Sequence, residues 1–318
     1  MKPLYEISPK IIKYVATISE KIGEVNAAHL NRPKTNLRKS NRIKTIQASL
    51  EIEGNTLTVE QITAILNNKR ILAPKKDILE VTNAIAVYDK IKQLNPVSLG
   101  DFKSAHKILM SQLVKNAGKF RTTEVGILTG SKVTHLAPPG HLVDSLMKDL
   151  FEFIKRDYEI LLIKSCVFHY ELEFIHPFID GNGRMGRLWQ TALLIPQYPV
   201  FEFLPIETIV KAKQKEYYHA LSQSDKSGNS TAFILFMLNV IDLSLDNLLK
   251  TQRVNLSEDE RIQIFREEIG THHFSRKDYL RQYKQISPAT ASRDLKKAVE
   301  RKIITKYGDK RMTRYKFN

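Results

Sequence analysis

Twelve consecutive residues, 176–187, bring together the side-chain types that phosphate chemistry needs. The segment HPFIDGNGRMGR holds a histidine, an aspartate, two arginines and three glycines. His176 has a pKa range suited to a general base, and Asp180 offers the oxygen ligands that Mg²⁺ accepts alongside phosphates. Arg184 and Arg187 lie three positions apart at the start of an expected helix, so both can reach one polyphosphate. The segment therefore predicts a loop that binds phosphates and a metal ion.

Three glycines shape this loop. Gly181 and Gly183 let the backbone approach a phosphate closely and direct N–H groups at it. The N-terminus of the helix that follows adds the positive end of its dipole. Together with Gly186 they also match the G-x-G-x-x-G pattern of a dinucleotide-binding fold, which requires a preceding strand within a βαβ unit. The apolar stretch 160–174 is long enough to be a helix instead, so we disfavour that interpretation.

A second candidate lies far upstream, in the sequence SLEIEGN of residues 49–55. A carboxylate at the end of a helix, here Glu53, can pair with an arginine that a nucleotide needs. Ser49 lies one helical turn earlier and can hydrogen-bond to that carboxylate. The alternative is an ordinary helix end with Gly54 as its cap, and the residues alone leave both open.

The elements that must position these residues are mostly helical. Thr58 and Gln61 form a capping box, and Ser98 caps the helix that begins at 99. Short β-prone pieces around 125–128 and 132–136 predict a hairpin with its turn at 130–131. The helices expected in the body cover about 8–30, 41–52, 58–68, 77–94, 99–113, 143–156, 160–174, 184–195, 207–223 and 230–251.

The composition becomes polar and basic from about residue 253. Helices are expected near 258–269, 275–283 and 288–301, followed by alternating pieces at 303–306 and 314–317. Three helices and a two-stranded hairpin are the pattern of a winged helix. The fold class is therefore mainly α. We divide the chain into an N-terminal helical region (1–95), a central domain (96–252) and a winged-helix domain (253–318).

The positive charge of the chain is concentrated locally. The 318 residues include 50 Lys and Arg against 34 Asp and Glu, a net charge of +16. Residues 31–45 hold six basic and no acidic side chains, and residues 275–318 hold fourteen basic against four acidic ones. A local excess favours a polyanion partner such as DNA, although a solvated charged face is the commoner explanation. The types that contact phosphates in the helix 288–301 are Ser292, Arg293, Lys296 and Lys297.

Other features limit the class of protein. The single Cys166 excludes an internal disulfide and a cysteine-based zinc site. No uninterrupted apolar run approaches the ~18 residues of a membrane span. The N-terminus lacks the apolar block of a signal peptide. We expect a reduced, cytoplasmic chain with no membrane partner.

The segment 176–187 resembles the Fic motif, H-x-F-x-[D/E]-G-N-G-R-x-x-R, at every fixed position. The resemblance implies a Fic helical core with a small hairpin flap, and an enzyme that transfers AMP from ATP to a Ser, Thr or Tyr hydroxyl of a target protein. His176 would deprotonate that hydroxyl, and Asp180 would hold Mg²⁺ on the phosphates. The backbone of 181–183 would form an anion hole. The other nucleotide-binding residues it implies are Asn182 at the α-phosphate, Gly186, and Arg184 and Arg187 at the β- and γ-phosphates.

Residues 49–54 resemble the inhibitory pattern of the same family, [S/T]-x-x-x-E-[G/N]. This implies the class with an N-terminal inhibitory helix, here about 41–55, in which Glu53 pairs with Arg187 and blocks the γ-phosphate. The hairpin lies where the family has its flap, which holds a target segment by β-augmentation. The flap residues would be Val133, Thr134, His135 and Leu136, and the nucleoside would lie near Tyr218 and Asp225.

Several alternatives stay open. The chain could instead be a DNA-binding regulator whose Fic body only senses nucleotide, or a Fic enzyme that mainly removes AMP. The sequence does not identify the target protein, and self-modification is one option. It leaves open whether the winged helix binds DNA or protein, and whether the chain forms a homodimer.

Overall fold

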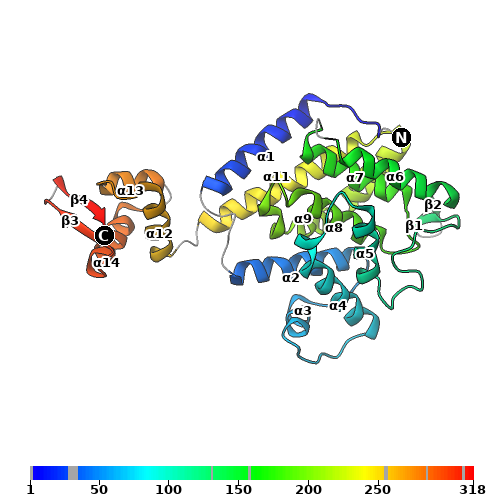
Figure 1. The fold of residues 1–318 in the computed structure, drawn as a ribbon, viewed down its shortest axis with the longest axis horizontal. Helices are drawn as coiled ribbons and strands as arrows, with labels where there is room; N and C mark the ends of the chain where they lie inside the picture. Colours follow the sequence, from blue (N-terminus) through cyan, green and yellow to red (C-terminus); the bar gives the residue numbers. More distant parts are fainter. Residues whose placement is uncertain are drawn as a thin grey trace. The chain divides into compact units, whose positions relative to one another are not determined.

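The computed structural model describes residues 3–27, 35–129, 132–156, 159–253, 257–283, 286–309 and 312–318. The chain divides into two compact units, Met1–Asp246 and Asn247–Asn318, which Figure 1 shows in sequence colours. The division falls within α11 (Thr231–Arg253), a few residues before the predicted boundary between 252 and 253. The assignment of a separate N-terminal region and central domain stays a prediction.

The first unit is built almost entirely from helices, which confirms the predicted fold class (Figure 1). Its first half contains α1 (Pro9–Ala27), α2 (Thr35–Ile52), α3 (Val59–Leu66), α4 (Lys75–Asp89), η1 (Ile91–Gln93) and α5 (Leu99–Leu109). A hairpin of β1 (Gly126–Thr129) and β2 (Lys132–Leu136) follows. The remaining elements are η2 (Gly140–Leu142), α6 (Val143–Ile154), α7 (Leu161–Ile175), α8 (Asn182–Leu194), η3 (Pro199–Glu202), α9 (Ile206–Ala212), α10 (Gln214–Ser227) and α11.

Local sequence signals explain where helices begin. Thr58 accepts a hydrogen bond from the Gln61 N–H while the Gln61 side chain accepts one from the Thr58 N–H, which confirms the predicted capping box. Ser98 accepts from the Asp101 N–H at the start of α5. Each cap satisfies backbone donors that have no partner inside the helix.

The centre of this unit is the pair α7 and α8. Nearly every residue of both helices is buried, as expected for helices surrounded by others. Phe102 of α5 contacts a ring of aromatic side chains there, with Phe178 and Phe151 at 5.5 Å and Trp189 at 5.0 Å between ring centroids. Because 176–181 connects α7 to α8, the most rigid part of the unit holds the predicted phosphate loop at both ends.

Two predicted helices differ from the structure. α2 begins at Thr35, six residues earlier than expected, and ends at Ile52, so Glu53 lies in the turn that follows rather than inside a helix reaching 55. The predicted helix 207–223 is wrong, because it is interrupted at Lys213. The two parts pack on different features of α2: α9 lies along the helix, whereas α10 contacts its end, where Gln214 donates to the Ile52 carbonyl at 3.2 Å.

One helix, α11, contains a stretch that is apolar enough to be considered as a membrane span. Residues Thr231–Lys250 of α11 are long and apolar enough, by length and composition, to cross a membrane. In the structure 56% of that stretch is buried among the other helices, and core helices of globular proteins pass the same test. It is weak evidence for a span.

The predicted hairpin is present. β1 and β2 pair antiparallel, with Gly126 opposite Leu136 and Thr129 opposite Lys132, and the register shifts between Ile127 and Leu128. Such an irregularity bends a hairpin. The predicted turn at 130–131 lies outside the described residues.

The second unit contains the elements that the sequence predicted there. They are α12 (Glu258–Ile269), α13 (Arg276–Gln282), α14 (Pro288–Glu300), β3 (Ile304–Tyr307) and β4 (Arg314–Phe317). Each helix starts at a serine cap, Ser257, Ser275 or Ser287. Phe265, Phe274, Tyr279, Leu295 and Phe317 form much of its core. Its role as a winged helix stays a prediction.

Candidate active site

The loop 176–181 begins with a strained residue. His176 closes α7 in the left-handed region, with φ 49° and ψ 58°, which residues with a side chain rarely adopt. Its N–H donates to the Leu172 carbonyl at 2.9 Å, and its carbonyl accepts from Arg121 Nε at 2.7 Å. Contacts on both sides thus fix the proposed base in an unusual conformation.

Arg121 connects the hairpin to this loop. Its guanidinium is buried, and besides His176 it donates to the carbonyls of Ile175 at 3.0 Å and Pro138 at 2.6 Å. Its backbone N–H donates to the Pro177 carbonyl at 2.8 Å. One arginine therefore holds the base of the hairpin against the loop. The flap residues Val133, Thr134, His135 and Leu136 lie in β2 of that hairpin, and their contact with a target stays a prediction.

The middle of the loop is locked by Gly181 and Asn182. Gly181 has φ +85°, and a Cβ there would lie 2.7 Å from Met110 Sδ, so only glycine fits. Asn182 is buried, accepts from the Phe178 N–H and donates to the Phe178 carbonyl, both at 2.9 Å. Because its amide is used inside the loop, Asn182 shapes the loop here, and its contact with an α-phosphate stays a prediction.

His106, on α5, supports the loop from beneath. Its ring stacks on Phe178 at 3.5 Å between centroids, and its Nδ1 accepts from the Gly118 N–H at 2.8 Å. Nε2 therefore carries the proton and donates to the Asp180 carbonyl at 2.9 Å. Burial lowers the pKa of His106 to about 4. The neutral His106 imidazole thus fixes the backbone position of Asp180 through this hydrogen bond.

Arg187 is held by the segment predicted to be inhibitory. Its Nη2 contacts Glu53 Oε1 at 2.7 Å and the Ser49 carbonyl at 3.0 Å, and its Nε donates to Ser49 Oγ at 3.0 Å. Burial alone would lower the pKa of Arg187, but the nearby carboxylates raise it. Nη1 is buried and has no hydrogen-bond partner among the described residues. One donor of this arginine thus remains for a ligand.

A second carboxylate, Glu173 on α7, lies beside Arg187. Burial would raise its pKa, but a hydrogen bond from His169 and the charges of His169, His176 and Arg187 keep that pKa below its usual range. Tyr217 also donates to Glu173, at 3.3 Å. The site therefore contains a stable negative charge next to His176.

Gly186 leaves room for this network. A Cβ at Gly186 would lie 2.6 Å from the His169 ring and 3.2 Å from Glu173 Oε1. His169 is fully buried and bonds to Gln190 Oε1 at 2.7 Å and Tyr217 OH at 3.1 Å. His169 is therefore a packed core histidine, and its closeness shows why the third glycine of the motif fits here.

Arg184 is engaged as fully as Arg187. It is buried, with Nη1 3.2 Å from Glu80 Oε1 and Nη2 3.1 Å from Asp180 Oδ1. Its Nε is buried without a hydrogen-bond partner among the described residues. Both loop arginines thus pair with protein carboxylates, while each keeps one buried nitrogen without a hydrogen-bond partner among the described residues.

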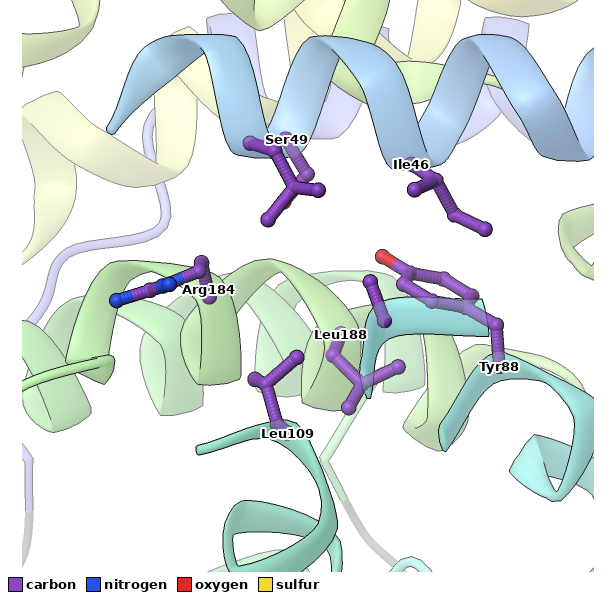
Figure 2. A pocket seen from close by; sticks show the side chains of 8 residues that line it. Ile46, Ser49, Tyr88, Leu109, Arg184 and Leu188 are labelled. Carbon is purple, nitrogen blue, oxygen red and sulfur yellow. The ribbon is translucent and has the colours of Figure 1, made fainter. Parts of the chain in front are cut away.

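The helix α2 closes tightly over α8. Figure 2 shows Ser49 and Ile46 of α2 facing Arg184 and Leu188 of α8, with Tyr88 at one side and Leu109 below. The cavity between them measures only about 10 Å³, room for one water at most. Helix α2 is therefore packed against the helix that carries both arginines.

The proposed nucleoside residues differ in their contacts. Tyr218 is half-exposed on α10, and burial together with the charge of Glu53 raises its pKa, which places it near the site. Asp225, at the far end of α10, accepts a hydrogen bond from Tyr170 at 3.0 Å. Nucleoside contact stays a prediction for both.

Asp180 has the features of a shared metal ligand. Its carboxylate is half-exposed at the loop. Within the described residues no group of three or more His, Cys, Asp and Glu side chains is placed to hold a metal ion. An ion here would depend on one carboxylate together with phosphate oxygens and water, which is how Mg²⁺ binds with nucleotides. The residues present fit that ion.

Known proteins resemble this chain in sequence and fold. The model of the Fic/DOC family matches residues 96–194. A solved structure of a Fic family protein from Desulfovibrio desulfuricans G20 is 37% identical, covers 100% of this chain and 98% of that chain, and has a TM-score of 0.77. The chain belongs to the Fic family.

Curated Fic relatives are more distant. A protein adenylyltransferase Fic from Nematostella vectensis is 26% identical over 264 residues, covering 77% of this chain and 59% of that protein. Another with this name, from Drosophila erecta, is 30% identical over 238 residues, covering 71% of this chain and 44% of that protein. The chain thus spans about half the length of the curated relatives it matches.

The sequence indicates the Fic loop itself but not the residues that support the loop. The motifs recognisable in the sequence do not include His106, Glu173, Glu80 or Arg121. A regular signal existed for Glu173, because it lies four residues after His169 on one helix face. His106 and Glu80 gave no comparable signal, since their partners are distant in sequence.

Proposed function

We propose that this Fic protein transfers AMP from ATP to a Ser, Thr or Tyr hydroxyl of a target protein, and that Glu53 holds it inactive at rest. The 2.7 Å contact between Glu53 and Arg187 carries this proposal. It joins the inhibitory segment to the arginine that the family motif assigns to the γ-phosphate. The curated relatives named protein adenylyltransferase support the chemistry.

The reaction needs a base, an anion site and an orienting clamp. The target hydroxyl attacks the α-phosphorus, its proton passes to His176, and the bond to the β-phosphate breaks to release pyrophosphate. The ionised Glu173 favours the imidazolium that forms. The first N–H groups of α8, at Asn182 and Gly183, stabilise the negative charge on the α-phosphate. Asp180 would hold a bound Mg²⁺, and that ion would supply positive charge to the phosphate oxygens.

Inhibition follows from competition for one cation. Arg187 cannot direct Nη2 at Glu53 and at a γ-phosphate simultaneously, so ATP is seated wrongly while the pair persists. Arg187 and its partner are largely buried, and a buried ion pair breaks only when another anion replaces the first. Loss of Glu53 therefore frees the arginine for nucleotide.

Label transfer from α-labelled ATP with Mg²⁺ tests both parts. We expect weak labelling by the wild type, strong labelling by Glu53→Ala, and none by His176→Ala in either background. Glu51→Ala is the matched control, because Glu51 is also a carboxylate near the end of α2 but pairs with Lys211 at 2.8 Å. Activation by both variants would show a general loosening of α2 and contradict inhibition through Arg187.

We propose DNA binding as a second function, on the face of α14 opposite its buried side. Ala291 and Leu295 face the core, whereas Arg293 and Lys296 are exposed. Lys296 forms only a loose pair with Glu300, at 3.8 Å. The other predicted phosphate contacts are engaged: Lys297 pairs with Glu258 at 2.7 Å, and Ser292 accepts from Arg276 at 2.8 Å.

Fluorescence anisotropy with a labelled duplex of mixed sequence tests this surface. We expect the full chain to bind in a salt-dependent way, and Arg293→Ala with Lys296→Ala to weaken binding about tenfold. Lys297→Ala is the control on the same helix and should change affinity little. Equal losses in all variants, or no binding at low salt, would contradict the proposed face.

A further inference from the structure

One buried carboxylate joins the inhibitory segment to the Fic loop. Glu80, on α4, is 6% exposed. Its Oε1 lies 3.2 Å from Arg184 Nη1, and its Oε2 accepts a hydrogen bond from Asn55 Nδ2 at 2.8 Å. The two oxygens of Glu80 thus serve two different parts of the site.

Asn55 uses its whole side chain in this position. It is buried, its Oδ1 accepts from the Leu57 N–H at 3.1 Å, and its Nδ2 also donates to the Asp77 carbonyl at 3.2 Å. The N–H contact at Oδ1 fixes the orientation of the amide, so its amino group faces Glu80. Hydrogen bonds to an ionised acceptor are among the stronger ones. Asn55 is therefore a firm attachment point for the segment.

The chain between this attachment and α2 is short. Its backbone is capped onto the helix, because the Glu53 and Asn55 N–H groups donate to the Leu50 carbonyl at 3.0 and 3.1 Å. α2 ends at Ile52, and Gly54 has φ +91° with open space where a Cβ would lie. Glu53 itself is 30% exposed. Its position against Arg187 is thus set by what holds the residues on both sides, α2 before it and Asn55 after it.

We propose that the Asn55–Glu80 contact is a latch that seats Glu53 on Arg187. This inference rests on the proposed autoinhibition and adds Glu80 and Asn55 as positioning residues. Because Arg184 shares the carboxylate, a polyphosphate that draws Arg184 away removes a contact that orients Glu80. Binding of nucleotide at the loop and release of the inhibitory segment are thereby coupled through one side chain.

Label transfer separates the latch from the inhibitory residue. We expect Asn55→Ala to raise transfer roughly tenfold over wild type, by loss of a charged hydrogen bond. In the Glu53→Ala background the same change should have no effect on transfer, because the carboxylate that pairs with Arg187 is already absent. Asn83→Ala is the matched control: Asn83 is a buried amide on α4 that donates to the Ser111 carbonyl at 2.8 Å. Its loss should not raise transfer.

Amide hydrogen exchange tests the latch without relying on transfer. We expect Asn55→Ala, and the milder Asn55→Ser, to accelerate exchange at residues 53–57, and Asn83→Ala to leave those residues unchanged. Unchanged exchange in both Asn55 variants would overturn the latch, as would a wild-type transfer rate in Asn55→Ala when Glu53→Ala is active. Faster exchange with no transfer by any variant would support the latch and contradict the proposed enzyme instead.

Discussion

The two units use their cationic side chains in opposite ways. In the first unit Arg184 and Arg187 are 4% and 1% exposed, and each pairs with a carboxylate from a distant part of the chain. In the second unit Arg293 is exposed on α14, and Lys296 is 76% exposed. A buried cation is costly to leave without its partners, whereas an exposed one gains little from any single partner. A buried cation can therefore bind a ligand only by exchanging its present partner for it. An exposed cation can attract a ligand directly, and the attractions of several such cations add.

The largest expected effect is on AMP transfer, and it distinguishes Arg187, which lies in the proposed active site, from Arg261, which does not. Arg187→Lys in the Glu53→Ala background should reduce AMP transfer by about 100-fold or more, because a lysine cannot reproduce the fork of donors at a phosphate. Arg261→Lys is the control. Arg261 is partly buried, pairs with Asp294 at 2.7 Å in the second unit and takes no part in the proposed chemistry. Comparable losses of transfer in both variants would mean that burial alone, and not the site, makes an arginine indispensable.

The next largest effect is on the pH dependence of stability, and it comes from the buried carboxyl group of Glu207. Glu207, on α9, is 1% exposed, and its Oε2 has no hydrogen-bond partner among the described residues. Burial raises the pKa of Glu207 to about 7, well above the usual value for a glutamate. The folded chain therefore holds a proton that the unfolded chain releases above about pH 4.5, and this contribution to stability is lost as pH rises toward 7. The loss amounts to about 3 kcal/mol.

Chemical denaturation at pH 5 and pH 8 measures this contribution. The Glu207→Gln variant should gain stability relative to wild type as pH rises between these values. For Glu51→Gln the difference from wild type should stay flat, because the hydrogen bond from Lys211 lowers the pKa of Glu51 and its titration lies below this range. A flat difference for both variants would show that Glu207 is ionised in the folded chain.

Much of this organisation was predictable from the sequence. The Fic loop is local, so one segment of twelve residues specified its glycines, base and arginines, and Thr58 and Ser98 marked helix starts correctly. The break at Lys213 was not predictable, because it depends on where α2 ends. The partners of the loop, such as Glu80, were missed for the same reason: each side chain is ordinary until folding brings it to an arginine about a hundred residues away.

Glycine positions test how firmly the loop is fixed. Gly181→Ala should destabilise the chain by about 2 kcal/mol, combining strain at φ +85° with a clash at Met110 Sδ. Gly228→Ala isolates the strain, because φ is +66° but the space is open, and should cost about 1 kcal/mol. Gly23→Ala, inside α1 with open space, should stabilise by about 0.5 kcal/mol. Equal costs at Gly181 and Gly228, measured by denaturation, would remove the clash from the explanation.

The smallest effect is expected for the exposed cations of α14, on the salt dependence of DNA binding. If Arg293 and Lys296 each neutralise one phosphate, removing either should lower the slope of log affinity against log salt by about 0.9. The two changes should add, because no shared burial couples them. Lys297→Ala should leave the slope unchanged, since its charge is paired with Glu258. Anisotropy titrations at several salt concentrations measure each slope. A non-additive or identical loss in all three variants would mean that these cations act as a network, like the buried arginines of the first unit.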